Sequence, residues 1–144
     1  MNRPVLRWRM VALSVAVGAA GACTSPTSTC QEANGVMGTW AYDATQESPL
    51  PGSLSGSLVI SSQHCTDFQG ALDVVEVLAT GETRRLVGPV SGTLVDATVA
   101  RFEVSLGGVG RDHLARIARD SLAGSWVESA GPAPGTGRFG GRRR

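Results

Sequence analysis

The chain has 144 residues, with thirteen basic residues (all arginine), twelve acidic residues and a formal net charge of +1. This length suits one domain with a core of its own. The near-neutral balance, without a basic field along the chain, argues against a nucleic-acid-binding protein.

The N-terminus has the three-part pattern of a secretory signal peptide. Three arginines among the first nine residues precede an apolar run over 10–20, and small residues follow up to Ala22. The run is about half of the ~20 residues that a membrane-spanning helix needs. We therefore expect residues 1–22 to be a cleaved leader and the protein to be exported.

The leader ends in Ala-Gly-Ala-Cys at 20–23, which resembles the bacterial lipobox. In that motif the cysteine receives a lipid and becomes the first residue of the mature protein. The resemblance implies lipidation at Cys23, a flexible tether over 23–34 and a membrane-anchored lipoprotein of the bacterial cell envelope. Ala20-x-Ala22 also suits ordinary signal peptidase, which would leave a periplasmic or secreted protein with Cys23 free or paired to another chain.

The cysteine count bears on this choice, because an odd cysteine outside the cell is a reactive liability. With Cys23 acylated, Cys30 and Cys65 remain as a pair suited to one disulfide in an oxidising compartment. That disulfide would close a loop of some 35 residues, a stabilisation of roughly 3–4 kcal/mol in the chain-entropy model.

Apolar and polar residues alternate from about residue 36 onward, which is typical of short antiparallel strands. We expect strands over 35–43, 53–62, 67–79, 84–95, 98–106, 122–128 and 137–141. The segment 111–122 fits either a helix or a strand, and consistency with its neighbours favours a hairpin that turns at 119–121. Pro89 cannot donate to a strand ladder, so we expect a bulge or bend there.

About eight sequential strands predict an all-β domain over 35–144, an antiparallel up-and-down barrel. Glycines in phase with the apolar positions support closure, because strands that coil sharply tolerate glycine at the bends. These are Gly38, Gly56, Gly70, Gly88 and Gly92. The alternative is an open sandwich. The final Gly-Arg-Arg-Arg, 141–144, is interpreted as a solvated basic tail; the alternative is contact with an anionic lipid or polymer.

The patterns "VMGTW" at 36–40 and "LAGSW" at 122–126 echo each other. We expect Gly38, Trp40, Gly124 and Trp126 to pack the barrel ends. Gly-x-Trp on a first strand resembles the calycin group, which includes lipocalins and avidins. With the leader and one disulfide, the chain resembles the bacterial metalloprotease inhibitor and outer-membrane lipoprotein group. In those inhibitors the N-terminal segment enters the protease cleft. Avidins surround their ligand with several Trp and Tyr residues, which this chain lacks.

Residues suited to catalysis or metal binding are sparse. His64, Cys65 and Asp67 form one small group without a second cluster at ligand spacing. His113 follows Asp112, but no Gly-x-Ser-x-Gly elbow presents a nucleophile. Phosphate-loop, dinucleotide and His-Glu-x-x-His patterns do not occur. We therefore expect a non-enzyme with no metal and no cofactor.

Two functions remain open. An interaction or structural module of the envelope, the protease inhibitor included, predicts a filled barrel with an exposed patch or a docking arm. A carrier predicts a cavity of at least ~300 Å³ for a small apolar ligand. Glu76 shares phase with the apolar positions of its strand, so it would point inward and orient a ligand unless a bulge exposes it; we expect the bulge. The interaction module is the favoured function.

Overall fold

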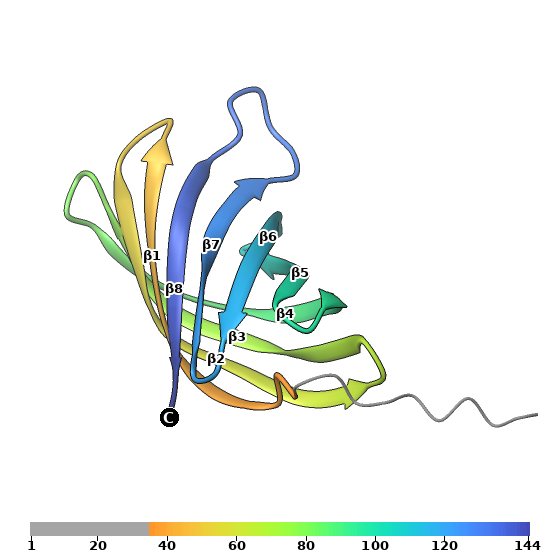
Figure 1. Ribbon diagram of the computed structural model, residues 1–144. Helices are drawn as coiled ribbons and strands as arrows, with labels where there is room; N and C mark the ends of the chain where they lie inside the picture. Colours follow the sequence, from red (N-terminus) through yellow and green to blue (C-terminus); the bar gives the residue numbers. More distant parts are fainter. Residues whose placement is uncertain (1–34) are drawn as a thin grey trace, which may run out of the picture.

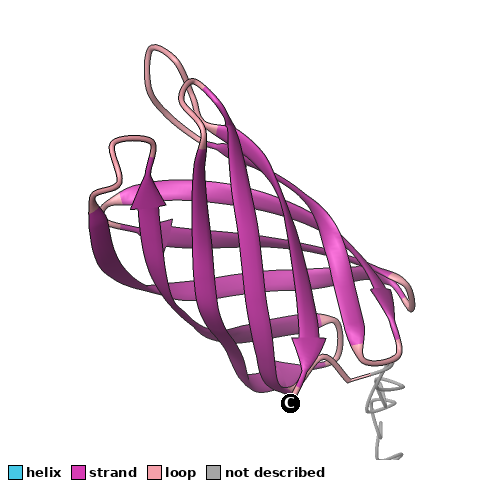
Figure 2. Ribbon diagram, turned by 90° about the vertical axis from the view of Figure 1, so that its left-hand side faces the viewer, coloured by secondary structure: helices cyan, strands magenta, loops and turns pink. Residues whose placement is uncertain are grey.

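Residues 35–144 are described by a computed structural model as eight strands that close into one antiparallel barrel (Figures 1 and 2). The strands are β1 (Gly38–Ser48), β2 (Gly52–His64), β3 (Asp67–Leu78), β4 (Thr83–Asp96), β5 (Val99–Leu106), β6 (Val109–Ala118), β7 (Ser121–Glu128) and β8 (Thr136–Arg143). Each strand pairs with the next, and β8 pairs with β1. The predicted up-and-down barrel is thus confirmed, and the open sandwich is wrong.

The alternating pattern puts one apolar row of each strand inside the barrel. Trp40, Leu58 and Leu72 are among the side chains with at most 2% exposure. All the buried apolar side chains form one cluster that the barrel encloses. Among the described residues, no helix is long and apolar enough to cross a membrane.

Glycines allow the strands to coil tightly enough for closure. A Cβ at Gly88 would overlap the carbonyl oxygen of Ser105 on β5, and one at Gly124 would overlap the carbonyl oxygen of Leu114 on β6. Any other residue at these positions would push neighbouring strands apart. Glycine at these positions therefore allows the strands to approach closely enough for the sheet to coil into a barrel.

The ambiguous segment forms the predicted hairpin. β6 and β7 pair from Arg111↔Glu128 to Ala118↔Ser121. The two-residue turn places Arg119 at φ 47°, and the Ser121 hydroxyl donates to the Ala118 carbonyl.

Two local expectations need correction. The β3–β4 register runs without a shift through Pro89, so this residue causes no bulge. The pairing of β4 with β5 begins at Val90, so Pro89 lies just outside the β4–β5 ladder. The basic end of the chain is also not a free tail, because Arg142 and Arg143 belong to β8 and pair with β1.

Candidate functional site

The two ends of the barrel differ in what closes them. At the terminal end lie Gly35, Arg144 and the β2–β3, β4–β5 and β6–β7 turns; at the loop end lie the other connections, including the long β7–β8 loop (Figure 1). Trp40, near the start of β1, lies toward the terminal end, and Trp126, near the end of β7, lies toward the loop end.

At the terminal end the arm that leads into β1 packs on Trp40, beside a hollow of about 710 Å³ lined by Gly35, Ile117 and Arg143 among others. The indole Nε1 of Trp40 donates to the Val36 carbonyl at 3.0 Å. The Arg143 guanidinium lies 4.4 Å above the Trp40 ring and donates to the carbonyls of Met37 and Gly35. This stack fixes residues 35–37 across the barrel end.

Trp126 has a different environment. Its ring lies under the Arg111 guanidinium at 4.8 Å, and its buried Nε1 has no hydrogen-bond partner within the described part of the chain. A Cβ at Gly137 would overlap the Trp126 ring, whereas one at Gly124 would meet the β6 backbone. The glycine that makes room for this indole is therefore Gly137, which the sequence analysis did not single out.

A buried hydrogen-bond relay crosses the middle of the barrel. Nδ1 of His113 lies 3.0 Å from the Arg111 carbonyl, which can only accept, so Nδ1 carries the proton. Nε2 then accepts from the Tyr42 hydroxyl at 3.0 Å. Burial lowers the pKa of His113 to about 4, and burial raises the pKa of Tyr42 well above its ordinary range. Both side chains are neutral at physiological pH and fully paired.

Aromatic rings from five strands fill the space around this relay. Phe102 stacks on His113 at 4.6 Å, Phe139 lies 4.9 Å from His113 and stacks on Tyr42 at 5.7 Å, and Phe68 meets Phe102 edge-on at 6.1 Å. This chain of ring contacts spans the interior, so side chains occupy the place where a carrier would hold its ligand.

Toward the loop end four charged side chains form a network, in which Glu76 and Arg111 are buried, Glu128 is partly exposed and Arg84 is about half exposed. Arg84 donates to Glu76, which lies 3.4 Å from Arg111, and Arg111 lies 3.2 Å from Glu128. Glu76 is 2% exposed. The expected bulge at Glu76 is wrong, because the β3–β4 register stays continuous and keeps the carboxylate on the inner face. The period-two pattern of β3 on its own had predicted that the Glu76 side chain points inward. The arginines that offset the cost of burying its charge come from other strands.

The groups considered for catalysis or metal binding do not assemble. Asp112 points outward while His113 points inward, so the two cannot form a catalytic pair. His64 pairs with Asp67 across the β2–β3 hairpin. Within residues 35–144, no three His, Cys, Asp or Glu side chains gather at metal-binding distances.

The predicted cysteine chemistry lies mostly beyond the described residues. Cys65 sits in the β2–β3 turn at φ 55°. Its predicted partner Cys30 and the lipidation residue Cys23 both precede residue 35, so the disulfide and the lipid remain predictions.

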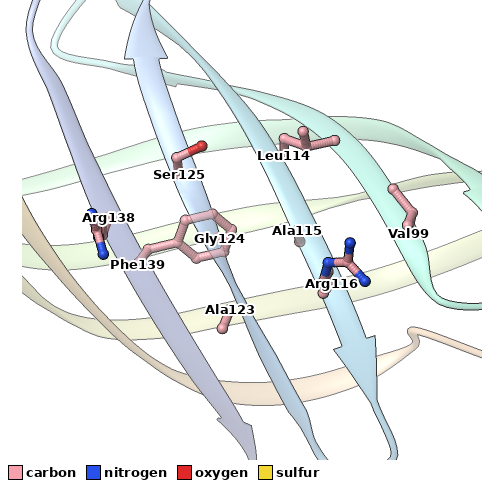
Figure 3. Close-up of a pocket in the computed structure, with 9 residues that line it drawn as sticks. All are labelled: Val99, Leu114, Ala115, Arg116, Ala123, Gly124, Ser125, Arg138 and Phe139. Carbon is pink, nitrogen blue, oxygen red and sulfur yellow. The ribbon is translucent and has the colours of Figure 1, made fainter.

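The outer surface of the barrel is hollowed over β6, β7 and β8. One hollow of about 660 Å³ is lined mainly by outward side chains, among them Leu114, Arg116, Ala123, Ser125 and Arg138. Arg116 and Arg138 lie on opposite sides of it, with Gly124 and Ala123 between them (Figure 3). A second hollow, of about 440 Å³, shares Arg138 and opens over β1 and β2.

Comparisons with known proteins agree on the architecture alone. No protein-family model and no curated protein matches the chain. Among solved structures, the chain is similar to a redesigned β-barrel, b11L5F_LGL, with a TM-score of 0.62, 14% identity and coverage of 82% of this chain and 99% of that one.

Two further neighbours have the same fold. EF1p2_mFAP2b, described as bound to DFHBI, gives a TM-score of 0.61 at 11% identity, covering 75% of this chain and 93% of its own. A de novo designed fluorescence-activating β-barrel gives a TM-score of 0.57 at 19% identity, covering 78% of this chain and 96% of its own. At these identities the likeness defines the class, small closed eight-stranded barrels. The expected resemblance to the inhibitor and lipoprotein group remains a prediction.

Proposed function

We propose that this protein is an exported, lipid-anchored, non-enzymatic barrel of the cell envelope that acts as an interaction module through its outer surface. The observation that carries the proposal is the filled interior. Rings from β1, β3, β5, β6 and β8 touch across the barrel, and the polar atoms of the central Tyr42–His113 relay are paired with each other and with backbone. The hollow of about 660 Å³ described above lies on the outside.

The proposed export and anchoring rest on the N-terminal sequence. The arginine-rich start, the short apolar run and the Ala-Gly-Ala-Cys ending suit a lipoprotein leader. Acylation of Cys23 would also leave Cys30 and Cys65 as an even pair.

Intact mass of the protein from membrane and soluble fractions tests this proposal, with Cys23→Ala as the control. We expect a membrane-bound chain that starts at Cys23, carries a diacylglycerol-sized addition and gains the mass of two hydrogens on reduction. The Cys23→Ala chain should lack the lipid. An unmodified wild-type chain in the soluble fraction would overturn the lipid anchor.

A carrier for a small apolar ligand is the second candidate. The DFHBI-bound barrel among the structural neighbours supports it, as does the unpartnered indole N–H of Trp126 at the loop end. Calorimetric titration with DFHBI and with a long-chain fatty acid separates the two candidates. The interaction module predicts no saturable heat; one-to-one binding that Trp126→Leu abolishes would favour the carrier.

The protease-inhibitor variant of the module would use the residues after Cys23, which precede the described part of the chain. Inhibition of a metalloprotease by the processed protein, lost when 24–34 are deleted, is the result that would support it.

A further inference from the structure

Arginines dominate one side of the outer barrel wall. We call this surface the arginine wall and define it by the outward side chains of Arg101 on β5, Arg116 on β6, Arg119 in the β6–β7 turn, and Arg138 and Arg142 on β8. All five are exposed. Strand register places them in adjoining rows, since Arg101 pairs with Leu114, Leu114 with Ser125, and Ser125 with Arg138.

The residues that the strand ladders place between these arginines are small or uncharged, whereas three exposed acidic residues lie at the margins, Asp120 next to Arg119 in the turn and Glu103 and Asp112 toward the loop end of β5 and β6. Arg116 pairs with Ala123, which pairs with Gly140, and Arg142 pairs with Ser121. None of these intervening positions is acidic. The guanidinium groups therefore stand above a low surface.

Few ion pairs neutralise the wall. Arg138 lies 3.2 Å from Glu47, but both side chains are more than half exposed, so the pair is weak. Arg116 contributes to lowering the pKa of Asp96, mainly held down by hydrogen bonds from Thr98. Arg101, Arg119 and Arg142 have no ion-pair partner among residues 35–144. The wall thus presents positive charge to its surroundings.

The opposite side of the barrel lacks this field. The outward residues of β2–β4 are mostly serine and valine, among them Ser53, Ser55, Val75 and Val87. Their charged pair on β3 and β4, Asp73 and Arg85, is bidentate and neutral overall. The barrel is therefore electrically one-sided.

We propose that the arginine wall docks the barrel onto an anionic bilayer surface. The arginines spread across the β5–β8 side instead of converging on one point, which suits a surface of distributed negative charge. The inference rests on the proposed anchor: Cys23 precedes Gly35 by twelve residues, and such a tether spans at most about 40 Å. An anchored barrel would be held within reach of lipid headgroups, and Arg119 and Arg142 lie at the terminal end where the tether joins.

Vesicle binding by an unlipidated protein separates docking from anchoring. The protein is the processed chain, 23–144, with Cys23→Ser, and the vesicles contain phosphatidylcholine with or without about a third phosphatidylglycerol. We expect cosedimentation with the anionic vesicles only, abolished by 0.5 M NaCl. Arg101→Gln, Arg116→Gln and Arg142→Gln together should weaken binding roughly 100-fold, since each basic residue near such a surface contributes about fivefold.

The matched control changes the net charge equally on the other wall. Ser53→Glu, Gln69→Glu and Thr83→Glu together should alter binding by less than about threefold at moderate salt, because these side chains face away from the bilayer. Circular dichroism verifies that both triple variants are folded.

Three results would overturn the proposal. The first is no binding of the parent chain to anionic vesicles, and the second is equal weakening by the two triple variants. The third is binding to polyglutamate without binding to vesicles, which would assign the wall to an acidic protein partner. If the wild-type chain carries the lipid at Cys23 while the Cys23→Ser chain gives any of these results, the proposed anchor stands and only the proposed docking wall is wrong.

Discussion

The interior and the outer wall of this barrel differ in how far their polar groups are already satisfied. Inside, Tyr42 and His113 bond to each other and to backbone, and Glu76 and Arg111 lie in one ion network. Outside, Arg101 and Arg142 have no ion-pair partner within residues 35–144. A satisfied group stabilises the fold, while an unsatisfied exposed charge remains free to bind something else. The comparison indicates that the interior stabilises the fold, and it supports the proposal that the outer wall binds a partner.

The strongest test of the interior compares two glycines on the same strand. A Cβ at Gly137 would overlap the Thr45 carbonyl oxygen and the Trp126 ring, while one at Gly140 meets nothing closer than 3.8 Å. Gly137→Ala should lower the free energy of unfolding by about 4–5 kcal/mol or prevent folding. Gly140→Ala should leave it nearly unchanged in urea unfolding. Equal effects would show that the inner surface is not tightly packed at this point.

The second test compares a buried and an exposed carboxylate on β3. Glu76→Gln removes the charge that pairs with the buried Arg111 and with the half-exposed Arg84, which we expect to cost about 4 kcal/mol, as breaking a buried ion pair does. Asp73→Asn removes the partner of Arg85 on the solvated wall and should produce no measurable change in urea unfolding. A small loss for Glu76→Gln would indicate that water solvates the loop end.

The third test uses pH. The folded protein holds the pKa of His113 at about 4, below its ordinary value of 6.5, so the unfolded chain takes up a proton first as the pH falls. The stability from neutral His113 is complete above about pH 6.5 and declines toward pH 4, a loss of up to about 3 kcal/mol. The control His113→Gln should lose this part of the pH dependence. An unchanged profile would contradict the buried neutral imidazole.

The smallest expected effect tests the relay itself. Tyr42→Phe leaves Nε2 of His113 without its donor and should lower stability by about 1–2 kcal/mol, read from urea unfolding at neutral pH. Tyr42→Phe combined with His113→Gln should cost less than the sum of the single changes, because the two side chains bond to each other. Strict additivity would mean that the relay contributes nothing as a pair.

The sequence predicted the barrel well because period-two alternation and short connections are local signals. The β6–β7 hairpin and the last strand were found in this way. Glu76 was misjudged because its buried partner, Arg111, comes from β6, and only the closed barrel brings the two together; its other partner, Arg84, lies directly across the β3–β4 hairpin. The same reason hides the Tyr42–His113 pair, which lies 71 residues apart in sequence.

The arginine wall was equally hidden. Its members alternate with small residues on separate strands, and the chain as a whole is nearly neutral. The final arginines suggested a tail, but β8 pairs with β1. Arg143 therefore stacks on Trp40 at the terminal end, and Arg142 belongs to the arginine wall. Only the register shows which charges share a face.

The central claim, that this barrel works through one outer wall and not through its interior, is tested most directly by paramagnetic relaxation. The lipidated protein would be placed in anionic nanodiscs that contain a spin-labelled lipid. The account predicts broadened amide signals for the outward residues of β5–β8, such as Arg116 and Ser125, and sharp signals for Ser55 and Val87. Broadening over β2–β4, or equally over both walls, would contradict it.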